Sequence, residues 1–159
     1  MPAASREPAA TAARIDAVSV DALFEALYRA AQKHAVRGVR TTFELIAWEP
    51  LAVAGDEPAL RQCLEPLIDA LADGPPGRRL VLRAFPAQEG DTVLFEFLCE
   101  GGDPPDASAP LDRARACIRR MGGEMGVFPA EDNRFGVWFW LPQWIAITGF
   151  PLDAFPRAA

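Results

Sequence analysis

The stretch VAGDEPALRQCLEPLIDAL, residues 53–71, decides the fold of this chain. A short apolar segment turns at Gly55 and Asp56 into a longer segment in which apolar residues recur every three or four positions. That spacing is typical of an amphipathic helix. Asp56 can cap the first turn, because its carboxylate accepts hydrogen bonds from free backbone N–H groups, and Pro58 loses nothing there. The stretch therefore predicts an apolar strand followed by a helix with one buried face.

Further helices and strands are predicted on both sides of this stretch. They comprise helices over residues 19–38 and 111–121, a strand over 39–47, and hairpins over 78–99 and 124–142. The helices rest on apolar spacing of three and four, and the strands on alternating β-branched and aromatic residues. Paired strands alternating with single helices favour an α/β (α+β) two-layer sandwich. We expect a mixed, mostly antiparallel sheet with about three helices on one face.

The chain of 159 residues is long enough for one domain with a substantial core. The first residues, 1–17, are rich in Ala and Pro without periodicity, which predicts a mobile N-terminal arm. We expect the domain itself over residues 18–142, followed by a C-terminal tail over 143–159.

Composition and charge exclude several classes of function. The formal net charge of -6 opposes binding to a phosphate backbone, so nucleic acid is not an expected partner. The longest apolar stretch, residues 135–152, is interrupted by two prolines and a glutamine, so no membrane span is predicted. Three cysteines without C-x-x-C spacing suit reduced thiols in a cytoplasmic protein.

Four segments together resemble, in order and spacing, the ATP-binding domain of bacterial sensor histidine kinases, a member of the wider histidine kinase-like ATPase (GHKL) superfamily. They are VAGDEPALRQCLEPLIDAL (53–71), VLFEFLCEGG (93–102), ACIRRMGGEMGV (116–127) and the closing Leu141-Pro142. These match the helix of the family's asparagine box, its first glycine box, the elements after its ATP lid, and its terminal Leu-Pro. The resemblance implies a Bergerat-like fold.

The asparagine box of that family, Asn-Leu-Leu-x-Asn-Ala, uses its second asparagine to help hold the Mg²⁺ of bound ATP. The resemblance places the first asparagine at Pro66 and the second at Ala70. An aliphatic side chain offers no oxygen ligand to a hard cation. Asp69 would point about 100° away around the helix, and Pro66 should kink that helix. The resemblance thus implies that the Mg²⁺ site is degenerate.

The family's first glycine box begins with an aspartate that accepts a hydrogen bond from adenine, and Cys99 takes that position here. A thiol is a weak acceptor, so we expect adenine recognition to be lost or much weakened. Gly101 matches the first glycine, but Asp103 replaces the second and would repel a triphosphate. Glu100 could substitute for the aspartate only by a one-residue slip, which places it on the opposite strand face.

The segment PPDASAPLDRAR, residues 104–115, takes the place of the ATP lid. The family's second glycine box needs several glycines so that backbone N–H groups can approach phosphate, and this segment has none. Changes in three elements together predict that the domain has no cofactor and holds no metal. ATP and Mg²⁺ are expected only if the chain is a divergent catalytic domain.

His34 is the only histidine and so the only candidate phosphoacceptor of the sensor-kinase type. It lacks the following acidic residue and the long helical hairpin that such a site is expected to have. We interpret it as a solvent-facing residue that stabilises a helix C-terminus.

Several residues near the C-terminus are candidates for a protein interface: Trp138, Trp140, Trp144 and Phe150. In the last predicted strand Trp138 and Trp140 face away from the apolar residues that alternate with them. Either the tail covers them, or they belong to an interface, where tryptophan is enriched. The third helix also carries a basic face with Arg115 and Arg119, which is either a solvated face or a docking patch for an acidic partner.

The sequence predicts a non-catalytic regulatory or scaffolding domain, a pseudokinase that acts by protein–protein contacts in bacterial signal transduction. The expected partner is a protein such as a kinase or a response regulator, and a homodimer is left open. Two alternatives remain: a divergent ATP-binding catalytic domain, and a histidine phosphotransfer component that uses His34.

Overall fold

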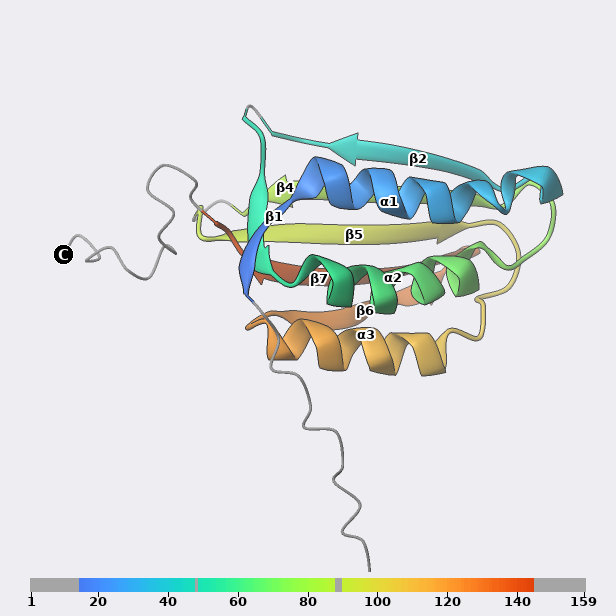
Figure 1. Ribbon diagram of the computed structural model, residues 1–159. Helices are drawn as coiled ribbons and strands as arrows, with labels where there is room; N and C mark the ends of the chain where they lie inside the picture. Colours follow the sequence, from blue (N-terminus) through green and yellow to red (C-terminus); the bar gives the residue numbers. More distant parts are fainter. Residues whose placement is uncertain (1–14, 48, 88–89, 145–159) are drawn as a thin grey trace, which may run out of the picture.

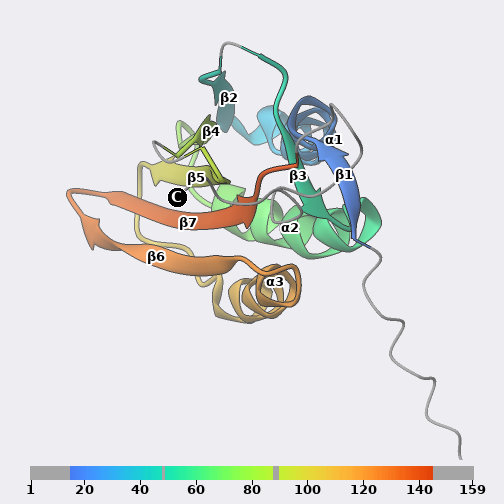
Figure 2. The ribbon, with the colours of Figure 1, turned by 90° about the vertical axis from the view of Figure 1, so that its left-hand side faces the viewer.

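The computed structural model describes residues 15–47, 49–87 and 90–144, which form a layer of helices over a sheet (Figures 1 and 2). The helices are α1 (Val20–Gln32), α2 (Glu57–Ala72) and α3 (Ser108–Arg120), with a 3₁₀ turn, η1 (Ala35–Arg37). The strands are β1 (Asp16–Ser19), β2 (Arg40–Leu45), β3 (Ala52–Gly55), β4 (Arg79–Pro86), β5 (Thr92–Glu100), β6 (Glu124–Glu131) and β7 (Arg134–Pro142).

The main sheet has five strands in the order β2-β4-β5-β7-β6. β2 and β4 are parallel, whereas every other neighbouring pair in it is antiparallel. All three α-helices cover the same face, as Figure 2 shows. The predicted two-layer sandwich with a mixed, mostly antiparallel sheet is therefore confirmed.

A second, two-stranded sheet of β1 and β3 crosses one end of the layer (Figure 1). β1 was not predicted, and it includes Asp16 and Ala17 of the expected N-terminal arm. Its short length explains the omission, since only Val18 among its four residues is buried and no alternation can be recognised. At the other terminus, Gln143 forms a bridge with Val53, and the Trp144 N–H donates to the Ala52 carbonyl at 2.9 Å. Residues 16–17 and 143–144 thus belong to the folded layer.

The helix starts follow the predicted caps. The Ala22 N–H donates to Ser19 Oγ at 3.3 Å, and the Ala59 N–H donates to Asp56 Oδ1 at 3.2 Å. α2 continues without interruption through Pro66 to Ala72. These caps satisfy backbone donors that have no partner inside the helix.

The core lies between the helices and the inner face of the sheet. Phe95 and Phe139 stack with ring centroids 4.5 Å apart, and Phe97 meets Phe139 edge-on at 5.3 Å. These rings come from neighbouring strands and are fully buried. On β7, Val137, Phe139 and Leu141 are buried while Trp138 and Trp140 are only half-buried, which confirms the predicted alternation.

Candidate functional site

The candidate site lies where the end of β5, the C-terminal turn of α2 and the β5–α3 loop meet, at the end of the layer opposite β1 and β3 (Figure 1). Cys99, near the end of β5, faces α2 and is 3% exposed. Its thiol donates to the Leu71 carbonyl, with an Sγ–O distance of 3.4 Å. Burial raises the pKa of Cys99, so the thiol stays protonated. β5 and α2 are thus joined directly at the position where the resemblance expects an adenine-binding aspartate.

Arg78 fills the space beside Cys99. It is 2% exposed, and its guanidinium donates to four backbone carbonyls. The acceptors are Gly101 at 2.9 Å, Leu71 at 3.3 Å, Asp73 at 2.7 Å and Asp103 at 2.5 Å. Two of them belong to the end of α2, where the helix dipole is negative, and two to the β5–α3 loop. We call this set of contacts the Arg78 clamp, because it ties α2 to the loop.

Little free volume remains around the Arg78 clamp. The hollow bounded by Arg78, Cys99, Gly101 and Phe135 leaves no room for a water molecule. Small-molecule pockets are commonly of roughly 300–1,000 Å³. Gly102 packs close enough that a methyl group there would meet Pro75 at 2.6 Å. The geometry at this position suits a packed contact between elements.

The residues at the expected Mg²⁺ site lie on α2 and face elsewhere. Ala70 is half-buried and packs against the core. Asp69 points to α1, where its carboxylate accepts a hydrogen bond from His34 Nε2 at 2.9 Å and lies 3.7 Å from Lys33 Nζ. Asp69 therefore points away from Ala70, as its helical position predicted. Among the described residues no group of three or more His, Cys, Asp or Glu side chains could hold a metal ion.

His34 is 9% exposed, so its interpretation as a solvent-facing residue was wrong. One ring nitrogen contacts Asp69 and the other contacts the Arg37 guanidinium, while Arg37 also reaches Asp73 at 3.2 Å. The turn of the chain at η1 brings His34 and Arg37 against α2. The contact of His34 with Asp69 could not be recognised in the sequence, because the two residues are 35 positions apart. With both nitrogens engaged, His34 joins the end of α1 to α2.

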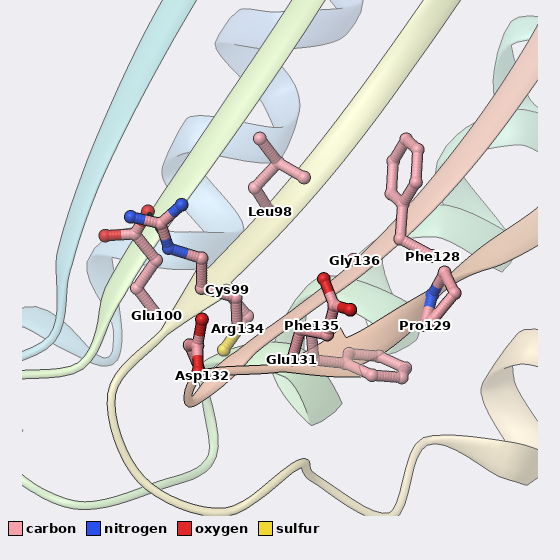
Figure 3. Close-up of a pocket in the computed structure, with 10 residues that line it drawn as sticks. All are labelled: Leu98, Cys99, Glu100, Phe128, Pro129, Glu131, Asp132, Arg134, Phe135 and Gly136. Atoms are coloured by element: carbon pink, nitrogen blue, oxygen red, sulfur yellow. Dashed lines mark ion pairs between the residues drawn. The ribbon is translucent and has the colours of Figure 1, made fainter.

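Glu100 lies on the outer face of the sheet, opposite to Cys99, as the strand period predicted. Its carboxylate is 3.6 Å from Arg134 Nε of β7. Both residues border a hollow of about 260 Å³ at the tip of the β6–β7 hairpin, which Leu98, Phe128 and Gly136 also line (Figure 3). Asp103 is exposed, and only its backbone carbonyl takes part in the Arg78 clamp. Glu100 therefore borders the outer hollow, whereas Gly101 and Asp103 contribute backbone carbonyls to the Arg78 clamp.

The interface candidates lie in three different places. Trp138 and Trp140 lie on the outer face of the sheet, whereas the backbone of Trp144 is attached to β3. On α3, Arg119 is exposed, but the half-buried Arg115 donates to the Met125 carbonyl of β6 at 3.3 Å. Arg115 therefore connects α3 to β6. Phe150 and the tail from residue 145 lie outside the described residues.

Arg78 was missed in the sequence because an arginine before a strand is usually a surface residue. The strand period could have identified it, since Arg78 stands two residues before Leu80, which is buried on the inner face. A charged residue on an inner face needs partners, and the glycine- and proline-rich loops around it supply free carbonyls.

Comparisons with known proteins agree with this fold. No family model matches the chain, and no curated protein matches it. The catalytic domain of histidine kinase ThkA has a TM-score of 0.68 at 17% identity, covering 82% of this chain and 97% of that one. Mycobacterial sensor histidine kinase MprB has a TM-score of 0.65 at 16% identity, covering 80% and 98%.

The histidine kinase AdeS of Acinetobacter baumannii is also similar, with a TM-score of 0.66 at 14% identity, covering 81% of this chain and 67% of that one. The chain therefore has the histidine kinase-like ATPase fold that the sequence segments indicated. None of the helices in the described part of the chain has the length and hydropathy needed for a membrane crossing.

Proposed function

We propose that this chain is a non-catalytic regulatory or scaffolding domain, which uses the fold of a histidine kinase catalytic domain to make protein contacts in bacterial two-component signalling. The observation that carries the proposal is the Arg78 clamp. Four charge-assisted hydrogen bonds occupy the region where the family resemblance expects nucleotide, and the hollow beside them has no room for a water molecule. An adenine ring could enter only if these bonds broke and left a buried charge unpaired.

The substitutions at three positions support the same proposal. Ala70 has no ligand atom for Mg²⁺, the Cys99 thiol is used as a donor to α2, and Glu100 points to the opposite face. Ala70 thus accounts for the loss of metal binding and Cys99 for the loss of adenine recognition. The orientation of Glu100 means that it does not replace the missing aspartate. Their joint occurrence fits a domain that keeps its fold and has lost its ATP chemistry.

The outer face of the sheet is the surface that fits a protein partner. Trp140 stands beside Leu94 of β5, and Trp138 stands beside Glu96. Phe85 of β4 and Phe128 of β6 extend the apolar area on either side, and all of these aromatic side chains are half-buried. Aromatic residues supply much of the binding energy in protein interfaces. We call the side chains of Phe85, Leu94, Trp138, Trp140 and Phe128 the outer aromatic patch.

The proposed partner is a response regulator or a sensor kinase in the cytoplasm. A structure of the similar kinase ThkA contains the response regulator TrrA, with a TM-score of 0.68 over 82% of this chain. The net charge of -6 makes nucleic acid an unsuitable partner. A homodimer through the same patch is the alternative that measurement of the molecular mass in solution would reveal.

Calorimetric titration of the full chain with ATP, with ADP and with each plus Mg²⁺ tests the absence of nucleotide binding. We expect no saturable heat at millimolar nucleotide. Binding in the micromolar range would overturn the proposal and support a divergent catalytic domain. In that case Glu100→Ala would show whether Glu100 has replaced the adenine-binding aspartate, because its loss should then abolish binding.

Affinity measurements with purified response regulators and sensor-kinase cores of the same organism test the contact surface. We expect at least one to bind, and Trp138→Ala or Trp140→Ala to weaken that binding by at least about 10-fold. Trp144→Ala is the matched control, because Trp144 is equally half-buried but is attached to β3. Equal effects of the three changes, or binding by none of the candidates, would contradict the proposed surface.

A further inference from the structure

Two thiols from different helices lie together between α2 and α3. Cys63 Sγ on α2 donates to the Leu60 carbonyl at 3.3 Å, and Cys117 Sγ on α3 donates to the Ala59 carbonyl at 3.6 Å. Ala59 and Leu60 are four and three residues before Cys63, so both sulfur atoms contact the same turn of α2. The two sulfur atoms also lie within hydrogen-bonding reach of each other. α2 and α3 run side by side (Figure 1), which keeps this pair together.

The surroundings of the two thiols make them unequal. The hydrogen bond from Cys63 lowers the pKa of Cys117 to about 7, with help from the Arg120 guanidinium and against the effects of burial and Asp56. The same hydrogen bond, together with burial, raises the pKa of Cys63. Near neutral pH, Cys117 is thus substantially thiolate while Cys63 holds its proton. The thiolate is the form of cysteine that attacks oxidants.

We propose that Cys63 and Cys117 are a thiol oxidation site, at which a peroxide or a disulfide oxidant joins α2 to α3 through a reversible disulfide bond. Such a bond needs the two Cβ atoms to be roughly 3.5–4.5 Å apart, which two side chains whose sulfur atoms contact the same turn of α2 can reach with small rotations. The proposal is independent of whether the domain binds a protein partner.

With hydrogen peroxide the chemistry balances in two steps. The Cys117 thiolate attacks one peroxide oxygen, the O–O bond breaks, hydroxide leaves and is protonated, and Cys117 becomes a sulfenic acid. The Cys63 sulfur then attacks that sulfur, the S–O bond breaks, and the hydroxyl group leaves as water with the Cys63 proton. The protein loses two electrons and two protons, and one peroxide becomes two waters.

Cys99 is a third buried thiol and provides a control. It contacts the Leu71 carbonyl, eleven residues after Leu60 on the same helix, which corresponds to about 16 Å along the axis. A disulfide between Cys99 and either partner of the pair would require a large backbone movement. Burial also raises the pKa of Cys99, so it is expected to react slowly.

Oxidation of the full chain with diamide or hydrogen peroxide, followed by non-reducing tryptic digestion and mass spectrometry, tests the proposal. The peptide of residues 62–78 should appear linked to that of residues 116–119, with the mass of two hydrogen atoms lost, and dithiothreitol should separate them. Cys99→Ser should give the same product, whereas Cys63→Ser should not. Any link through Cys99, or free thiols at both positions after oxidation that fully consumes an exposed model thiol, would overturn the proposal.

The pH dependence of alkylation by iodoacetamide tests the unequal roles. The Cys117 thiol is faced by Cys63 and Asp56 from α2 and by Arg120 from α3. We expect the labelling rate of Cys117 to reach half its maximum near pH 7 in the native chain, with Cys63 labelled more slowly. Faster labelling of Cys63, or a midpoint above pH 8.5 for Cys117, would overturn the assignment of Cys117 as the attacking thiol.

Discussion

The two faces of the sheet are built from the same strands and differ sharply in what covers them. On the inner face Phe95, Phe97 and Phe139 are fully buried and touch one another beneath the helices. On the outer face Trp138 and Trp140 belong to the same strand as Phe139, yet they remain half-buried. Since adjacent residues of one strand are compared, local structure cannot explain the difference. The inner face serves stability, and the outer face keeps large aromatic groups available for contact.

The sharpest test of this comparison is Phe139→Ala. We expect it to lower the free energy of unfolding by about 3–5 kcal/mol, because it removes a stacked ring and leaves a cavity in a core that cannot fully collapse. Chemical denaturation followed by circular dichroism measures the change. Trp138→Ala, one residue away, is the control and should lower stability by about 1 kcal/mol or less. Similar losses for both changes would show that the outer face is covered as well.

The Arg78 clamp is the polar part of the inner face, and Arg78→Met should destabilise the chain by about 3 kcal/mol. Methionine keeps much of the apolar stem but leaves buried carbonyls without their charged donor. Arg78→Lys is the matched control and should recover part of the loss, since an ammonium retains the charge without the planar fork. Hydrogen exchange should become faster in the β5–α3 loop of both variants. A neutral effect of Arg78→Met would remove the main support for the proposed function.

Close packing also occurs on the outer face, at Gly136 of β7. A methyl group there would lie 2.7 Å from Phe128 and 2.8 Å from Leu98, so Gly136→Ala should cost about 1–2 kcal/mol of stability. Thermal unfolding measures it. The double variant Phe128→Ala, Gly136→Ala should lose less stability than the sum of the two single variants, because the loss of the Phe128 ring removes its clash with the new methyl group. Additive losses would indicate that Phe128 is not held against Gly136.

The smallest effect is expected at the ion pair of the outer face. Arg83 Nε lies 2.8 Å from Glu44 Oε2 and Arg83 Nη1 lies 3.6 Å from Glu96 Oε2, but all three side chains retain solvent contact. Arg83→Gln should therefore change stability by less than about 1 kcal/mol, and less still at high salt. Urea titrations at two salt concentrations measure both values. A larger loss of stability that does not depend on salt would contradict the partial exposure of Arg83, Glu44 and Glu96.

Much of the fold could be predicted from the sequence because its elements obey local rules. The apolar spacing of α2 and the caps at Ser19 and Asp56 require only neighbouring residues, and both caps are present in the structure. The strand period also placed Cys99 and Glu100 on opposite faces. β1 was missed, because a strand of four residues with one buried position carries no periodic signal and depends on its partner β3.

The candidate site was less predictable than the fold. Family resemblance identified Ala70 and Cys99 as altered positions, and their surroundings are consistent with that interpretation. It did not indicate Arg78, whose four acceptors come from the end of α2 and from the β5–α3 loop, nor the contact of His34 with Asp69 across 35 residues. The contacts of Arg78 and His34 form only when the helices pack on the sheet.

The sequence by itself determined the order and the buried faces of the three helices and of the strands of the main sheet, and its resemblance to the kinase family predicted the loss of side chains suited to nucleotide. These properties depend on residue type and on spacing along one element, which a linear pattern records. Only the tertiary structure decided that Arg78 is buried beside Cys99, that His34 is buried, and that Cys63 and Cys117 contact one turn of α2. Such contacts depend on the relative position of separate elements, which side-chain packing fixes and no local pattern encodes.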